Sequence, residues 1–144
     1  MKRIVILLVL IGVTAVAQED RHEKIKALKR AYITEELELT TAEAEKFWPI
    51  YNSYEEKMHT LKRSERNEFR VFKNDGIEAL SESEANTLIE KINEFHTKEY
   101  QYRTALLQEL KNVLSAKKIL RLKKAEDDFK RQLLKQYRQR KGKE

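Results

Sequence analysis

Residues 40–61 read TTAEAEKFWPIYNSYEEKMHTL, and this stretch decides the fold class. Its apolar residues recur at alternating intervals of three and four, which places them on one face of an α-helix. A capping box marks the start of this helix: the Thr40 hydroxyl can accept from the Glu43 amide, and the Glu43 carboxylate from the Thr40 amide. Pro49 interrupts the stripe, and a proline inside a helix loses one backbone hydrogen bond and bends the axis. We therefore predict a helix from Thr40 with a bend near Trp48.

The same kind of helix start recurs twice further along the chain. Ser81 and Glu84 can form a second capping box, and Ser115 begins a third start in which Lys118 stands where a glutamate would close the box. Stripes of helical spacing follow both starts, and another stripe precedes the first box. Asn74-Asp75-Gly76 is a turn signal, so the helices on its two sides are antiparallel neighbours. The sequence predicts an all-α fold, an elongated antiparallel helical hairpin of four helices.

The apolar stripes define the expected core. Their members are Ile25, Leu28, Tyr32, Ile33, Leu37, Ala44, Phe47, Tyr51, Tyr54, Met58, Leu61, Phe69, Phe72, Ala85, Leu88, Ile92, Phe95, Tyr102, Leu106, Leu110, Val113, Ile119, Leu122, Ala125, Phe129, Leu133 and Tyr137. Such stripes bury only a narrow seam on each helix, so we expect a thin core with apolar surface left over. Five aromatic residues exceed what this core can cover, and we predict that they help to bind a client or partner protein. They are Trp48, Tyr51, Tyr54, Tyr100 and Tyr102.

The composition argues against several folds and activities. The 144 residues are 38% charged and include only 3 Gly, 1 Pro and no Cys. So few glycines cannot supply the turns of a β-sandwich or a Gly-rich phosphate loop. The lack of Cys removes disulfides, thiolate metal sites and a Cys nucleophile. The chain also has no Gly-Ser nucleophile elbow and no His-Glu-x-x-His zinc signature. We therefore predict that the protein is not an enzyme.

Residues 1–17 have the layout of a secretory signal peptide. A positively charged start is followed by the apolar stretch Ile4–Val13 and by Ala15-Val16-Ala17, whose small residues are typical of a cleavage site. The apolar segment is shorter than the ~20 residues of a membrane span. We expect a cleaved signal peptide and a periplasmic product. The mature part should comprise a single helical domain over residues 18–137 and a frayed basic tail over residues 138–144.

The C-terminal part of the chain is strongly basic. Residues 115–144 hold 12 Lys and Arg against 4 Asp and Glu, net +8, whereas residues 18–114 hold 16 against 20, net −4. Export and the lack of an aromatic stacking platform argue against nucleic acid. Anionic lipid headgroups, an acidic protein surface or a solvated C-terminus remain as interpretations. We predict that Arg131, Lys135 and Arg138 contribute to partner binding.

A divalent metal site is a further hypothesis. His59 and His96 are level in a hairpin that turns between residues 76 and 77, and Glu55 and Glu99 lie within one helical turn of them. Two histidines with one or two carboxylates suit zinc, cobalt or nickel. The alternative is a pair of unrelated histidines on a solvated surface, in which case no cofactor is bound.

The segment Phe47-Trp48-Pro49-Ile50-Tyr51, which follows Leu39-Thr40, resembles small exported helical proteins described as "sensor of ECF-type sigma factor", a group similar to the Spy/CpxP-like periplasmic family. Supporting stretches are Lys26-Ala27-Leu28-Lys29 before Ile33-Thr34-Glu35, Leu80-Ser81, and Leu114-Ser115-Ala116-Lys117-Lys118 running into Lys123-Lys124-Ala125-Glu126-Asp127-Asp128-Phe129. The wider family begins helices with Leu-Thr-x-x-Gln, but this chain has Glu43, Glu84 and Lys118 at the Gln position. The resemblance implies a hooked helical hairpin, commonly a dimer, that acts in the envelope stress response.

Three hypotheses for the function follow. The first is ATP-independent, chaperone-like binding of unfolded or envelope proteins. The second is a regulatory sensor subunit that docks on a membrane signalling partner through its basic C-terminal helix. The third is divalent-metal sensing through His59 and His96. Association of two copies of the chain is compatible with each.

Overall fold

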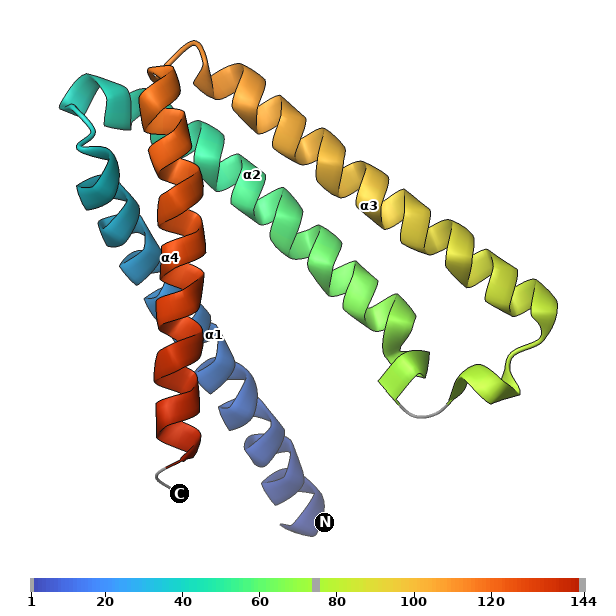
Figure 1. Cartoon of the computed structure of the whole chain (residues 1–144). Coiled ribbons are helices and arrows are strands. Elements are labelled where there is room, and N and C mark those ends of the chain that lie inside the picture. Colours follow the sequence, from blue (N-terminus) through green and yellow to red (C-terminus); the bar gives the residue numbers. More distant parts are fainter. Residues whose placement is uncertain (1, 74–75, 143–144) are drawn as a thin grey trace. The chain divides into compact units, whose positions relative to one another are not determined.

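The computed structural model describes the backbone of residues 2–73 and 76–142, and the side chains of residues 20–72 and 76–142. All regular elements in these ranges are helical, which confirms the all-α expectation (Figure 1). They are α1 (Lys2–Leu37), α2 (Thr41–Glu68), the 3₁₀ segments η1 (Phe69–Lys73) and η2 (Gly76–Ala79), α3 (Glu82–Leu110) and α4 (Ala116–Lys141).

The chain divides into two compact units, and the single domain expected over residues 18–137 stays a prediction. One unit comprises residues 1–39 and 120–144, and the other comprises residues 40–119.

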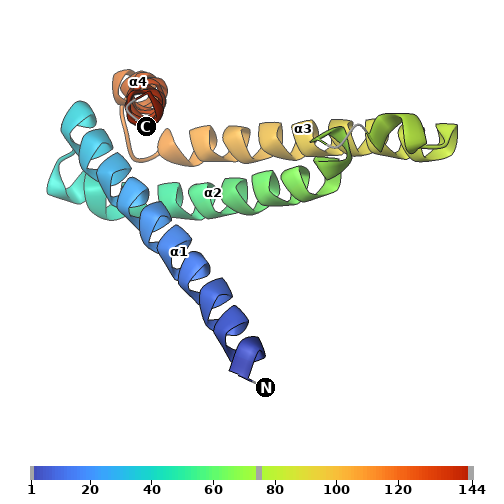
Figure 2. The ribbon, with the colours of Figure 1, turned by 90° about the horizontal axis from the view of Figure 1, so that it is seen from below.

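In the unit of residues 40–119, α2 and α3 run antiparallel and side by side (Figures 1 and 2). Its core is the predicted seam. The buried side chains are Phe47, Tyr51, Tyr54, Met58, Leu61, Leu106, Leu110 and Leu114. The rings of Phe47 and Tyr51 stack with their centroids 5.2 Å apart. Helix α2 continues through Pro49, and the bend expected near Trp48 stays a prediction.

The connection between α2 and α3 is more elaborate than the single turn that the sequence suggested. Residues 74 and 75 of the expected turn lie outside the described residues. Before them, α2 gives way to a 3₁₀ segment at Phe69, whose ring stacks on Phe72 at 5.3 Å and contacts Phe95 of α3 edge-on at 5.7 Å. Phe69, the first residue of η1, therefore packs against α3.

In the other unit, α1 and α4 meet through Tyr32 and Phe129, whose ring centroids are 5.9 Å apart. The buried residues of this unit are Ile33, Leu37, Leu122 and Ala125. Leu28 and Tyr137 are exposed, as is Phe72 in the unit of residues 40–119, so the prediction of these three as core residues was wrong. The two helices diverge toward the chain termini, and the ends of the two stripes therefore lose their partner (Figure 2).

Two further expectations concern the ends of the chain. Helix α4 extends to Lys141, so residues 138–141, which we expected to be frayed, are helical. The expected signal peptide lies within the backbone of α1, but its side chains are outside those described, and cleavage stays a prediction. In the described part of the chain, no helix combines the length and the apolar character that a membrane crossing needs.

Candidate interaction surfaces

Both predicted capping boxes are present. The Thr40 amide donates to Glu43 Oε2 at 2.9 Å, and the Glu43 amide donates to Thr40 Oγ1 at 3.2 Å. The Ser81 amide donates to Glu84 Oε2 at 2.8 Å, and the Glu84 amide donates to Ser81 Oγ at 3.2 Å. The hydrogen bonds from Ser81 hold the pKa of the Glu84 carboxyl below its ordinary value. These boxes fix where α2 and α3 begin and hence which residues face the seam.

The third helix start is linked to the first. The Lys118 amide donates to Ser115 Oγ at 3.3 Å, which is half of a capping box. The Lys118 side chain instead donates to Glu43 Oε2 at 2.6 Å. This hydrogen bond, followed by that from the Thr40 amide, lowers the pKa of Glu43. Lys118, which cannot close the capping box of Ser115, thus pairs with Glu43, which closes the capping box of Thr40.

The five aromatic residues predicted to bind a client lie in different environments. Tyr51 is 2% exposed and Tyr54 is also buried, so both belong to the core, and their assignment to a binding surface was wrong. Each lies on the side of α2 that faces the seam, where ring contacts with neighbouring aromatic residues cover it. Trp48 and Tyr102 are half-buried, and Tyr100 is open to solvent.

Tyr100 belongs to an exposed apolar row that the sequence reasoning missed. Ile89, Tyr100 and Leu107 of α3 are 57%, 71% and 45% exposed. Their spacings of 11 and 7 residues are close to whole numbers of helical turns, so all three lie on one face of the helix. We call them the α3 stripe. The spacings of 11 and 7 residues indicate this shared face in the sequence. Intervals of three and four, which define the core stripes, do not include these residues.

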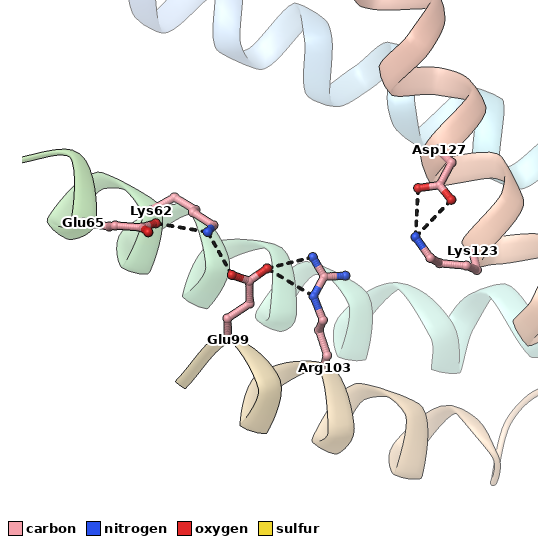
Figure 3. Close-up of polar contacts among 6 residues, drawn as sticks. All are labelled: Lys62, Glu65, Glu99, Arg103, Lys123 and Asp127. Atoms are coloured by element: carbon pink, nitrogen blue, oxygen red, sulfur yellow. Dashed lines mark hydrogen bonds and ion pairs between the residues drawn. The ribbon is translucent and has the colours of Figure 1, made fainter. Parts of the chain in front are cut away.

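An ion-pair network joins α2 and α3 (Figure 3). Glu99 accepts from Lys62 at 2.9 Å on one carboxylate oxygen and from Arg103 at 3.1 Å on the other. Lys62 also donates to Glu65 at 3.0 Å. Arg103 lies one turn from both Tyr100 and Leu107 along α3. The network therefore places charges of both signs next to an exposed apolar row.

The same contacts shift two pKa values. The hydrogen bond from Lys62, assisted by that from Arg103, holds the pKa of the half-buried Glu99 carboxyl below its ordinary value against an opposing effect of burial. The hydrogen bonds to Glu99 and Glu65 raise the pKa of Lys62. Both shifts favour the charged forms, so the network is strongest while Glu99 is ionised and Lys62 is protonated.

Helix α4 carries the predicted basic residues. Two of its acidic residues are engaged by cations nearby: Lys123 donates to Asp127 at 2.8 Å (Figure 3), and Asp128 accepts from Lys124 at 2.5 Å and from Arg131. Lys135 and Arg138 are exposed, and Arg138 belongs to a basic last turn. The positive charge of α4 beyond Asp128 therefore faces solvent.

The structure places both histidines of the metal hypothesis on the surface. His59 and His96 are both exposed, and Glu99 is engaged by Lys62 and Arg103. Among the residues that the structure describes, no three His, Asp or Glu side chains gather as a metal site would need. Metal binding stays a prediction, with these two histidines as its candidates.

No protein-family model, curated protein sequence or solved structure matches this chain. The resemblance to the Spy/CpxP-like family thus rests on the motifs alone. What the structure defines is a class: an all-helical protein with a capped α2–α3 hairpin and two distinct exposed surfaces, the α3 stripe and the basic end of α4.

Proposed function

We propose that the protein is a periplasmic stress-response protein that binds unfolded or envelope proteins without ATP. The observation that carries this proposal is the α3 stripe, where three large apolar side chains are exposed on one face of a helix. The neighbouring face of the same helix contributes Leu106 and Leu110 to a packed core. The stripe is therefore part of an ordered surface and not of a loosely packed core.

The chemistry of such a surface suits reversible capture. An apolar side chain contributes roughly 1.5–3 kcal/mol when it becomes fully buried, so a client segment that covers part of three gains only modest affinity. The charged side chains beside the stripe keep a bound, aggregation-prone client soluble. Binding of this kind needs no nucleotide, because apolar contacts form and break at equilibrium.

The test is suppression of client aggregation by residues 18–144, followed by light scattering at several ratios of protein to client. We expect the wild-type protein to suppress scattering. The variant Ile89→Ser/Tyr100→Ser/Leu107→Ser should lose most of this effect, because its apolar row is gone while its charges are unchanged.

A matched control is Leu28→Ser/Leu120→Ser, which removes exposed apolar side chains from the other unit. This variant should suppress aggregation like the wild-type protein. An equal loss of aggregation suppression in both variants would indicate that any exposed apolar side chain binds the client non-specifically. Full suppression by the stripe variant would refute a role of the α3 stripe. Circular dichroism should show unchanged helicity in both variants.

A regulatory subunit that docks on a membrane signalling protein is the second candidate, favoured by the exposed cations Arg131, Lys135 and Arg138 on α4. It does not require the α3 stripe. Truncation at Leu134 should abolish capture of such a partner from envelope extract, while the stripe variant should capture it normally. Unchanged capture by the truncated chain would refute this candidate.

A further inference from the structure

The end of α4 has a charge distribution unlike the rest of the chain. Residues 130–141 read KRQLLKQYRQRK and hold six Lys and Arg but no Asp or Glu. The whole segment is helical, and each of its side chains is exposed except that of Leu133, which is half-buried. We call it the α4 basic segment.

The residues of this segment sort by helical position. At about 100° per residue, Leu133, Leu134 and Tyr137 fall within one sector of about 100°. Lys130 and Lys141 fall within the same sector, one near each end of the segment. The apolar residues are therefore bracketed by cations along the helix axis.

The remaining positions complete the pattern. Arg131 and Arg138 lie on one flank of the apolar sector, and Arg140 lies on the other. The opposite side of the helix is formed by uncharged glutamines together with one lysine: Gln132, Gln136, Gln139 and Lys135. Favourable interaction with the helix dipole explains cations in the last turn, but it does not explain an apolar sector ringed by them.

The apolar sector is accessible. Leu134 is 47% exposed and Tyr137 is 54% exposed. The Lys141 ammonium lies 5.4 Å from the centre of the Tyr137 ring, so a cation sits at the edge of the apolar sector. Tyr137 offers an apolar ring with a polar end, a combination suited to a water–lipid boundary.

We propose that the α4 basic segment binds in the plane of an anionic membrane surface. Leu133, Leu134 and Tyr137 enter the headgroup region, while the flanking Lys and Arg side chains extend their apolar stems and place their charges at lipid phosphates. The glutamine side faces water. Charge complementarity and the cation-ringed apolar sector favour this occupant over an acidic protein. The inference is independent of the α3 stripe.

The test is flotation of residues 18–144 with vesicles of equal parts phosphatidylglycerol and phosphatidylcholine, compared with vesicles of phosphatidylcholine alone. We expect binding to the anionic vesicles only, and weaker binding as salt screens the charges. Each Lys or Arg held near an anionic surface is worth roughly fivefold in affinity. Every variant below shares the same N-terminus, so differences between variants report on α4.

Two single substitutions that remove the same charge test the orientation. Lys130→Gln, on the apolar side, should weaken binding roughly fivefold, and Lys135→Gln, on the glutamine side, should change it much less. Leu134→Gln/Tyr137→Gln should also weaken binding although the charge is unchanged. Circular dichroism and melting curves confirm that each variant retains its helices.

Three outcomes would overturn the proposal. The first is no binding to the anionic vesicles at low salt. The second is an equal effect of Lys130→Gln and Lys135→Gln with none from Leu134→Gln/Tyr137→Gln, which is the behaviour of an unoriented polycation. The third is capture of soluble polyglutamate as tightly as of vesicles, which would assign the segment to an acidic protein partner.

Discussion

Lys118 Nζ lies 2.6 Å from Glu43 Oε2, the same carboxylate oxygen that accepts the Thr40 amide at 2.9 Å. One oxygen therefore completes the N-terminal cap of α2 and pairs with the first turn of α4. Both residues belong to the unit of residues 40–119. Lys118, which cannot close a capping box at its own helix start, thus has a structural role at the start of α2.

This pairing predicts that Glu43 and Lys118 are energetically coupled. Glu43→Gln keeps a side chain that can close the capping box but removes the charge, and it should lower the melting temperature because the ion pair is lost. Lys118→Gln should do the same, and the double variant should cost less than the sum of the two. Additive effects would contradict coupling. The control is Lys117→Gln, at an exposed neighbouring position, which should leave the melting temperature nearly unchanged.

The contrast between buried and exposed tyrosines predicts a large difference in stability. Tyr51→Ala should lower the free energy of unfolding by about 3–5 kcal/mol, because it opens a cavity where the ring of Phe47 now stacks. Tyr100→Ala should change it by no more than about 0.5 kcal/mol. Urea denaturation measures both. Similar costs for the two substitutions would be inconsistent with this division between core and surface.

The ion-pair network predicts a loss of stability in acid. The pKa of Glu99 is lowered from its ordinary value of 4.5, so its contribution is present above that pH and is lost as the pH falls through the lowered pKa. The pKa of Lys62 is raised above 10.5, and its contribution is lost as the pH rises beyond that value. We expect the contribution of this network to the melting temperature to be constant between these limits and to fall on both sides.

A substitution at Glu99 isolates the network's part of this profile. Glu99→Gln should lower the melting temperature at neutral pH and make its decline below pH 4.5 shallower, because one carboxyl no longer takes up a proton on unfolding. Glu109→Gln, at an exposed position on α3, serves as the matched control. An acid decline that is the same in both variants would show that other carboxylates account for it.

Backbone strain at the end of α1 predicts a stabilising substitution. Glu38 has φ = 48°, in the left-handed region that non-glycine residues avoid. Its ion pair with Arg121, at 3.4 Å on the surface, contributes little. Glu38→Gly should therefore raise the free energy of unfolding by about 0.5–1 kcal/mol, as measured in urea. Glu38→Ala loses the same charge without relieving the strain, and it should not be stabilising.

Much of the secondary structure could be predicted from the sequence because its signals are local. The Thr40 and Ser81 capping boxes involve residues three positions apart, and the structure contains both. The burial predicted for Phe47, Met58 and Leu110 was also correct. Burial was predicted wrongly where an apolar stripe extends beyond the helix that it packs against. Leu28 and Tyr137 have the right spacing for burial, but spacing alone does not reveal where two helices diverge.

By itself, the sequence determined the all-helical class, the helix starts and the face of each helix that carries apolar residues, because these depend on side chains within a few positions of one another. Only the tertiary structure decided that Lys118 reaches Glu43, 75 residues away, and that Glu99 reaches Lys62 across the hairpin, 37 residues away. It also decided which tyrosines are covered. These outcomes depend on the register and angle of two packed helices, and small shifts in either exchange one long-range partner for another.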